Sequence, residues 1–348
     1  MKLTTTAQNP FEWLAINTGL APEPIAVGHF GYLVSKFLLE AIDKNVFETI
    51  GKRKCTLQEI ALACSLHEGS LNKLLGLLAS MGLIDFKNNL FSLTKKSKKW
   101  LLKDSPSSMY WLLMFDQHVC FNWMNYVGEF LQTGKGLQYH STFNEQQWFY
   151  YQKAMECVAK NAAREIVSKV PSLSTPATML DIGGSHGLYS AAFCKKYPGL
   201  QATVFDLPSA IDQTKKMEKD ANTESSITYL PGDILTDNIG ENKYDFILMA
   251  SVAHHFTEEE NIMVTNKVRA ALKPGGYYTI MEVLSPKKIQ RNGDMLSTIG
   301  DLFFALSSTS GTWNLRQIKN WMQHANLSII KKSSFLFLPG YVAITGKK

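Results

Sequence analysis

Residues 179–206 read MLDIGGSHGLYSAAFCKKYPGLQATVFD and predict a strand, a glycine-rich turn, a helix and a second strand. The apolar run 178–182 predicts the first strand, and Leu188 opens a predicted helix that the Pro-Gly pair at 198–199 ends. Three glycines, which let the backbone turn sharply and approach a ligand, stand between them at Gly183, Gly184 and Gly187. This order of elements predicts a nucleotide-type cofactor site.

One aspartate lies in the glycine turn, and another stands at the end of the second strand. Asp206 follows the strand-like run 202–205, where a carboxylate can accept both hydroxyls of a ribose. Asp181 lies within the glycine turn and would repel the pyrophosphate that a dinucleotide places over a helix N-terminus. The sequence therefore favours a cofactor with a cationic amino-acid group over a dinucleotide.

Further strand signals continue to the C-terminus. They lie at 227–230, at 244–249, at 277–282 after a Pro-Gly turn over 272–276, at 327–332 and at 341–346. Strands of this kind alternating with helical segments predict an α/β domain with a mostly parallel, Rossmann-like sheet.

The motif D-I-G-G-S-H-G at 181–187 resembles the first motif of class I S-adenosylmethionine (SAM) dependent methyltransferases, with Ser185 in place of a middle glycine. The resemblance implies a seven-stranded methyltransferase sheet in which the terminal pair of strands contributes one antiparallel strand. It also implies SAM as cofactor, S-adenosylhomocysteine (SAH) as its product, and no metal. The cofactor-binding residues that it implies are Asp181, Gly183, Gly184, Gly187, Asp206, Leu207, Asp233, Ile234 and Ser251.

Length and composition agree with an enzyme of two or more parts. The chain has 348 residues, 45% of them hydrophobic, which is enough for a catalytic domain and a smaller unit. No uninterrupted apolar run approaches the roughly 18 residues that span a bilayer, so we expect a cytoplasmic protein without a membrane partner. Five scattered cysteines fit buried thiols in a reducing compartment. The formal charge of +6 is modest for this length.

The first third of the chain predicts helices followed by a hairpin. An apolar-rich helix is expected over 31–42, Thr56 and Glu59 form a capping box for a second, and Ser70 is expected to cap a third that ends at Met81. Residues 83–94 then predict a hairpin with its turn at 87–89. This order is typical of a winged helix, which first suggests a DNA-binding module.

The third predicted helix argues against DNA binding. Its sequence, SLNKLLGLLASM, has Lys73 as its one basic residue, so little is available to read base edges. Leu74, Leu77 and Leu78 instead predict a buried packing helix. Residues 1–105 carry 13 Lys and Arg against 9 Asp and Glu, an excess of only four, and we expect no nucleic-acid partner.

The order of parts resembles the small-molecule O-methyltransferases related to the plant caffeic acid and the acetylserotonin enzymes. The resemblance spans nearly the whole chain and implies three parts: a winged-helix dimerisation domain at 1–105, a helical connector roofing the substrate pocket at 106–170, and a SAM-binding methyltransferase domain at 171–348. It implies a homodimer through the N-terminal domain and a small-molecule acceptor. Its implied acceptor-binding residues are Met155, Phe304 and Trp313.

The same resemblance places a general base after the fourth strand of the methyltransferase sheet. There the chain reads Ala253-His254-His255-Phe256, so His254 takes the base position and His255 stands where the family has an aspartate. Glu282 matches a family acid at the end of the fifth strand, whereas Trp313 stands where the family has a second acid. A phenol titrates near about 10 and an imidazole near about 6.5, so an imidazole can take the proton as the oxygen attacks. A histidine that only packs, and a solvated Glu282, are the competing interpretations.

Three classes of function follow from these motifs. The leading one is O-methylation of a phenolic hydroxyl on a small secondary metabolite, with His254 as base and Glu282 orienting it. The second is a SAM-binding relative that catalyses N- or C-methylation or a non-methylating reaction in the same pocket. The third, a winged-helix regulator, is disfavoured by the leucine-rich third helix.

Overall fold

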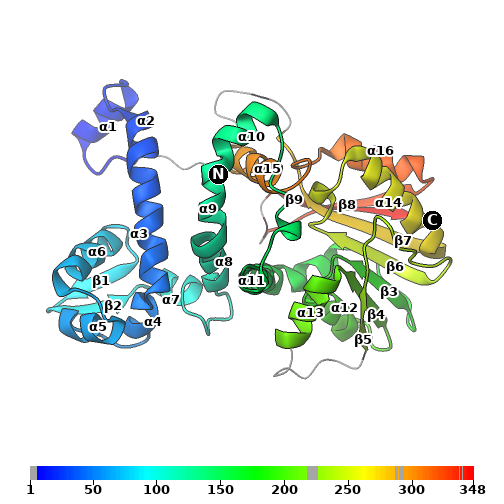
Figure 1. Cartoon of the computed structure of the whole chain (residues 1–348), viewed down its shortest axis with the longest axis horizontal. Helices are drawn as coiled ribbons and strands as arrows, with labels where there is room; N and C mark the ends of the chain where they lie inside the picture. Colours follow the sequence, from blue (N-terminus) through cyan, green and yellow to red (C-terminus); the bar gives the residue numbers. More distant parts are fainter. Residues whose placement is uncertain (1–5, 218–225, 287–288, 290–293, 337, 339) are drawn as a thin grey trace. The chain divides into compact units, whose positions relative to one another are not determined.

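The structure is a computed structural model, and it describes residues 6–217, 226–286, 289, 294–336, 338 and 340–348. The chain divides into two compact units, Met1–Phe121 and Asn122–Lys348, whose elements are labelled in Figure 1. The expected connector 106–170 is shared between these two units. The three-part division of the chain stays a prediction.

The N-terminal unit is helical apart from one hairpin of strands β1 and β2. Its elements are α1 (Pro10–Asn17), α2 (Glu23–Ile25), η1 (Ala26–Phe30), α3 (Gly31–Asp43), α4 (Val46–Ile50), α5 (Leu57–Cys64), α6 (Glu68–Ser80), β1 (Ile84–Lys87), β2 (Leu90–Leu93), α7 (Lys95–Trp100), α8 (Tyr110–Phe115) and η2 (Asp116–Cys120). The expected helices and the hairpin are therefore present. The chain reverses between β1 and β2 at two asparagines in the left-handed region, with φ of 54° and 59°, as a tight hairpin turn requires.

The helix caps of this unit confirm one prediction and correct another. Thr56 and Glu59 form the predicted capping box at the start of α5. Helix α6, however, starts two residues before Ser70, because the ring of His67 accepts the backbone N–H of Ser70 and serves as the cap. Histidine is an uncommon cap, so the serine was the stronger signal in the sequence.

The leucines of α6 pack inside the N-terminal unit, in a different set from the one predicted. Leu71, Leu75 and Leu78 are buried to 1% exposure or less. Leu74 and Leu77, which were expected inside, are only half-buried. The positions 71, 75 and 78 follow the helical repeat that faces the core, and 74 and 77 lie at its margin.

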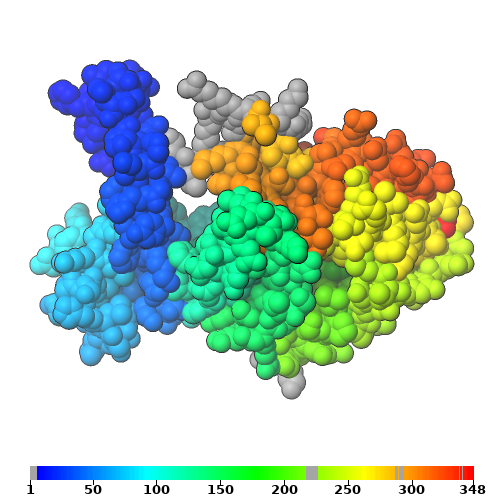
Figure 2. All heavy atoms as spheres, turned by 45° about the horizontal axis from the view of Figure 1, so that its top comes forward, coloured from blue at the N-terminus to red at the C-terminus, as the bar shows by residue number. Residues whose placement is uncertain are grey.

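One helical stretch is longer and more apolar than the sequence suggested. Glu23–Asp43 is continuous over 21 residues, and an 18-residue window of it has a mean hydropathy of 1.4, enough to cross a membrane by length and composition; 17% of that window is buried. The sequence has no uninterrupted apolar run of this length, since Lys36 and Glu40 lie within the stretch. The stretch forms one long helix because the π-helical turn η1 continues through Gly28, His29 and Gly31 without a break. Buried core helices and leader sequences can have the same length and composition. Figure 2 shows this stretch in dark blue, with its side chains at the surface of the N-terminal unit.

The C-terminal unit is built around a seven-stranded sheet. Its helices are η3 (Met124–Tyr126), α10 (Val127–Thr133), η4 (Tyr139–Ser141), α11 (Glu145–Lys169), α12 (Leu188–Lys196), α13 (Pro208–Met217), η6 (Ala253–His255), α14 (Glu258–Ala271), α15 (Met295–Ser307) and α16 (Leu315–His324), and α9 (Phe121–Trp123) lies across the boundary of the units. Its strands are β3 (Thr178–Ile182), β4 (Gln201–Asp206), β5 (Ile227–Pro231), β6 (Tyr244–Ala250), β7 (Leu272–Val283), β8 (Ser328–Ser334) and β9 (Tyr341–Lys347).

The strand order is β5-β4-β3-β6-β7-β9-β8. All neighbours from β5 to β7 pair in parallel, whereas β9 runs antiparallel to both β7 and β8. The predicted fold class, a Rossmann-like methyltransferase sheet with one antiparallel strand, is confirmed. The expected Pro-Gly turn before the fifth strand lies within β7, where the register against β6 shifts between Tyr244 and Phe246.

Helices cover both faces of this sheet, as Figure 1 shows. On one face Leu180 and Ile182 of β3 pack in a core cluster with residues of α14 and α16. On the other face Met179 packs with residues of α11 and α12. Neighbouring residues of a strand point to opposite faces, so a strand covered on both sides reads as a continuous apolar run. This arrangement leaves the carboxyl ends of the strands as the edge at which a site can form.

Candidate active site

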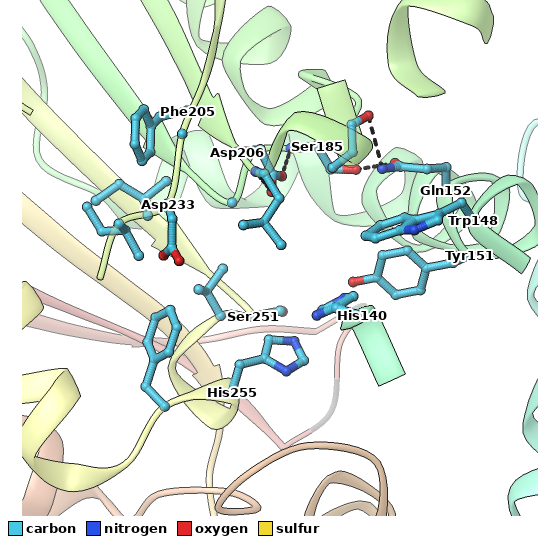
Figure 3. Close-up of a pocket in the computed structure, with 18 residues that line it drawn as sticks. His140, Trp148, Tyr151, Gln152, Ser185, Phe205, Asp206, Asp233, Ser251 and His255 are labelled. Carbon is cyan, nitrogen blue, oxygen red and sulfur yellow. Dashed lines mark hydrogen bonds between the residues drawn. The ribbon is translucent and has the colours of Figure 1, made fainter. Parts of the chain in front are cut away.

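A cavity lies at the carboxyl ends of β3, β4, β5 and β6. Figure 3 shows its walls, which come from these strand ends on one side and from α11 and η4 on the other. Its lining residues are His140, Trp148, Tyr151, Gln152, Ile182, Gly183, Ser185, Phe205, Asp206, Leu207, Ala210, Gly232, Asp233, Ile234, Ser251, Val252, His255 and Phe256.

The glycine turn is shaped by the protein's own packing. Gly183 and Gly187 have φ of 68° and 72°, in the left-handed region that disfavours a side chain. A Cβ on Gly184 would lie 2.7 Å from Cγ of Asp181, and one on Gly187 would lie 2.6 Å from the hydroxyl of Tyr229. Of the three, only Gly183 lines the cavity. The sequence correctly marked the turn, but two of its glycines are required by neighbouring side chains of the protein.

Asp181 lies beneath this turn and not on the cavity wall. It is fully buried, and the hydroxyl of Ser190 donates to its Oδ2 at 2.8 Å. Its Oδ1 has no hydrogen-bond partner among the residues that the structure describes. Burial raises the pKa of Asp181 to about 7, against the lowering effect of Ser190. A positive charge near this buried carboxyl group would stabilise its ionised form.

Asp206 stands at the end of β4 with its carboxylate at the cavity (Figure 3). The backbone N–H of Ser185 donates to Oδ2 at 2.8 Å, and that of Leu207 donates to Oδ1 at 2.7 Å. Burial raises the pKa of Asp206 to about 6, although both N–H groups act in the opposite direction. Each oxygen keeps a second lone pair, so this carboxylate can still accept two hydroxyl groups.

Asp233 lies across the cavity from α11, in a more apolar part of the wall. Its Oδ1 accepts the backbone N–H of Leu235 at 2.9 Å, and Phe205, Ile234 and Phe256 line the space around it. A flat ring with a polar edge suits such a place. The residues present therefore fit SAM: Asp206 for the ribose hydroxyls, Asp233 with its apolar neighbours for the adenine, and the turn at Gly183 for the amino-acid part.

His254 lies in η6, directly after β6, and is hydrogen-bonded to Glu282 at the end of β7. Its Nδ1 is 3.0 Å from Oε2 of Glu282, and the two side chains are 3% and 0% exposed. The interpretation of Glu282 as a solvated strand end is excluded by this burial. When Glu282 is ionised, its carboxylate accepts from Nδ1–H, which leaves the lone pair of a neutral ring on Nε2.

The backbone of this segment is held from two sides. The carbonyl oxygen of Ala253 accepts from Nε1 of Trp313 at 2.9 Å and from Nδ2 of Asn261 at 3.0 Å. The predicted capping box of Thr257 at the start of α14 is also present. Because these bonds fix the backbone, the His254 ring is placed by the fold and not by its own rotamer alone.

The His254 ring contacts the His255 ring, which in turn contacts the ring of His140. The His255 ring centroid is 4.2 Å from that of His254 and 4.6 Å from that of His140, which stacks on Trp148 at 5.5 Å. Burial and, to a smaller extent, the neighbouring His254 lower the pKa of His140 to about 3. Burial, His254 and His140 likewise hold the pKa of His255 well below its ordinary value. His140 and His255 are therefore neutral at pH 7.

The predicted site residues fall into two groups. Those on the cavity wall are Gly183, Asp206, Leu207, Asp233, Ile234 and Ser251. Those elsewhere are Asp181, Gly184, Gly187, Met155, His254, Glu282, Phe304 and Trp313. The Phe304 ring packs 4.1 Å from the His254 ring, Met155 is half-buried on α11, and Trp313 is 9% exposed in the core against Trp321. The contact of these three with an acceptor stays a prediction.

Sequence reasoning missed the wall that η4 and α11 supply. His140, Trp148, Tyr151 and Gln152 all line the cavity, and no local motif singles them out. The family resemblance predicted a helical roof over 106–170 but not the residues that line the cavity.

Comparison with known proteins supports a SAM site at this edge of the sheet. A family model described as an O-methyltransferase domain matches residues 128–326, and one described as an O-methyltransferase dimerisation domain matches residues 29–103. The L-tyrosine C(3)-methyltransferase of Streptomyces lavendulae is 25% identical over 88% of this chain and 87% of its own length. A human protein described as a probable bifunctional dTTP/UTP pyrophosphatase/methyltransferase is 23% identical over 73% of this chain, which spans only 43% of that protein.

Among solved structures, human N-acetylserotonin methyltransferase in complex with SAM has the same fold. It superposes with a TM-score of 0.83 at 18% identity, and 99% of each chain is covered. The cofactor of the chain is SAM, in agreement with the fit of Asp206 and Asp233. The chain belongs to the O-methyltransferase family, as a SAM-dependent methyltransferase with an N-terminal dimerisation domain.

Proposed function

We propose that the protein methylates a hydroxyl oxygen of a small, phenolic metabolite, with His254 as general base. The observation that carries this proposal is the buried hydrogen bond between His254 Nδ1 and Glu282 Oε2. It fixes the tautomer in which Nε2 can take a proton, and it places a carboxylate where the resulting imidazolium is stabilised. A histidine that only packs has no need of a buried carboxylate.

The residues divide the work of the reaction between them. SAM supplies an electrophilic methyl group and leaves as SAH. Nε2 of His254 takes the proton of the acceptor hydroxyl as its oxygen becomes nucleophilic, and Glu282 offsets the charge that forms on the ring. The apolar and aromatic wall of α11 and η4 excludes water from the site, which strengthens these electrostatic effects. The aromatic character of this wall also supports a flat acceptor.

One relative supports a second candidate function. The L-tyrosine C(3)-methyltransferase methylates, by its name, a carbon of an aromatic ring, and it aligns with 88% of this chain. A phenol ring carbon becomes nucleophilic when the phenol loses its proton, so the same base can serve either outcome. The two candidates differ in the atom that carries the new methyl group.

A labelled-methyl assay separates these candidates. The protein is incubated with SAM carrying a tritiated methyl group and with matched phenols, anilines and ring-methoxylated analogues in which the hydroxyl is blocked. O-methylation predicts a labelled ether from the phenols and no product from the blocked analogues. Label on a ring carbon, or on the aniline nitrogen, would contradict the leading proposal and support the second one.

We also propose a cytoplasmic homodimer that forms through the N-terminal unit. The match to a dimerisation domain over residues 29–103 supports the assembly, and the cysteines are free thiols, which supports a reducing compartment. Large apolar side chains that are about half exposed or more lie on the first helices of the unit and on the loop after α1, a pattern typical of an interface. They are Phe11, Trp13, Leu14, Leu20, Ile25, Val27, Phe30, Tyr32 and Phe37.

A further inference from the structure

Ser185 is a residue with a side chain in the middle of the glycine turn. Its φ is 48°, in the left-handed region that a residue with a Cβ rarely adopts. A serine is strained there unless the surrounding structure holds it in place. Glycine would adopt this conformation freely, so the serine side chain needs a reason to be present.

Every polar group of Ser185 is engaged. Its backbone N–H donates to Oδ2 of Asp206 at 2.8 Å, and its carbonyl oxygen accepts from Oγ1 of Thr214 at 3.2 Å. Its hydroxyl donates to Oε1 of Gln152, and Figure 3 shows this bond at the edge of the cavity. The bonds to Thr214 and Gln152 hold the strained residue in the orientation that aims its N–H at Asp206.

Gln152 is the anchor of this arrangement. It lies on α11 with a side chain that is fully buried. Its Oε1 accepts from Ser185, and its Nε2 lies 3.4 Å from the carbonyl oxygen of Ala210 on α13. A buried amide must be paired, so it ties α11 to the glycine turn and to the segment that follows Asp206.

We propose that Gln152 and Ser185 form a positioning pair that sets the carboxylate of Asp206 for the ribose hydroxyls of SAM. The inference rests on the proposed role of Asp206. Neither Gln152 nor the Ser185 hydroxyl binds the ribose itself in this account. Their effect reaches the cofactor through the Ser185 N–H, which fixes one oxygen of Asp206, while the Leu207 N–H fixes the other.

The test compares SAH with its 2′-deoxy analogue, which lacks one of the hydroxyls that Asp206 is proposed to accept. Calorimetry on the full-length protein gives the ratio of the two affinities. Wild type should prefer SAH by about 10-fold or more, as one lost charge-assisted hydrogen bond predicts. In Ser185→Ala and in Gln152→Leu the SAH affinity should fall about 5- to 10-fold while the analogue loses less than about 2-fold, so the ratio collapses.

Three further variants make the result specific. Ser185→Gly relieves the strain but still loses the bond to Gln152, so its ratio should collapse as well. The double variant Gln152→Leu with Ser185→Ala should be no worse than either single one, because both remove the same bond. Thr345→Val removes another buried hydroxyl pair, 2.8 Å from Thr279 in the sheet, and should keep the wild-type ratio.

Two results would overturn the inference. A wild-type ratio in folded Ser185→Ala and Gln152→Leu would show that the pair does not act on the ribose site. Equal binding of SAH and its analogue by wild type would remove Asp206 from the ribose and the pair with it, while leaving the methyl-transfer assay as the separate test of the reaction.

Discussion

The glycine turn and the His254 segment meet at one edge of the sheet, yet they are built differently. The turn is local: Asp181, Gly183 and Asp206 lie within 26 consecutive residues, joined by one helix. The His254 segment is assembled from distant parts, with Glu282 as partner, Trp313 fixing the backbone, and Phe304 and His255 against the ring. The glycine turn binds the cofactor, which is the same whatever the acceptor is. The His254 segment faces the chemistry of the acceptor and can differ from one acceptor to another. We therefore expect substitutions in the turn to change cofactor binding and substitutions in the His254 segment to change the rate of methyl transfer.

The largest effect is expected from His254→Ala. Loss of the base should lower the rate on the true acceptor by about 10² to 10⁴, while SAM affinity stays near wild type, because the cofactor contacts lie on Asp206 and Asp233. Steady-state kinetics and calorimetry measure the two quantities. His255→Ala is the matched control and should cost much less, since that ring is not bonded to Glu282. An equal loss of rate in both variants would show that His254 is not the general base.

Asp206→Ala should show the opposite pattern. Removal of the carboxylate from the ribose site should weaken SAM binding by roughly 2 to 4 kcal/mol without unfolding the protein. At saturating SAM the rate should recover, because His254 and Glu282 are unchanged. Calorimetry with a thermal-unfolding check tests this, and a folded variant with wild-type affinity would remove Asp206 from the site.

The dimer should depend on the exposed apolar helices of the N-terminal unit. Ile25 and Phe30 are 58% and 55% exposed. The double substitution Ile25→Asp and Phe30→Asp places two charges in this apolar surface, so the dissociation constant of the dimer should rise at least about 10-fold. Leu62→Asp on α5 is the control, because Leu62 is 85% exposed but lies outside the first helices. Sedimentation at several concentrations decides the matter. A dimer that survives the pair but not Leu62→Asp would place the interface elsewhere.

The smallest effect concerns stability against pH. Burial raises the pKa of Asp206 to about 6 and of Asp181 to about 7, whereas an unfolded aspartate titrates near about 3.9. Between about pH 4 and pH 7 the folded state holds more protons, so the stability of the SAM-free protein falls as pH rises through this window. Asp206→Asn removes one of these titrations and should unfold at a higher temperature than wild type near neutral pH.

The higher unfolding temperature of Asp206→Asn should disappear near about pH 4. At about this pH the wild-type aspartate is protonated in the folded state and about half protonated in the unfolded chain. Calorimetric unfolding across the pH range, without SAM, measures it. A variant less stable than wild type at neutral pH would show that the two backbone N–H groups outweigh the burial of the carboxylate.

The division between local and assembled parts also explains what the sequence could predict. The strands and helix of 178–206, the capping boxes of Thr56 and Thr257, and the cavity position of Asp206 follow from local patterns. His140 and Gln152 could not be found, since their roles depend on the packing of η4 and α11 against the turn. The same limit applies to the burial of Trp313 and to the cap formed by His67.

The most direct test of the central claim, that His254 removes the acceptor proton, is the pH dependence of the ratio of wild-type to His254→Ala rates on a phenol at saturating SAM. At a pH of about 10, near the pKa of a phenol, about half of the phenol is already ionised, and this ionised fraction needs no base. The account predicts a ratio of about 10² or more near pH 7 that falls steadily toward one as pH approaches about 10. A ratio that stays constant across this range, or that is near one at pH 7, would contradict it.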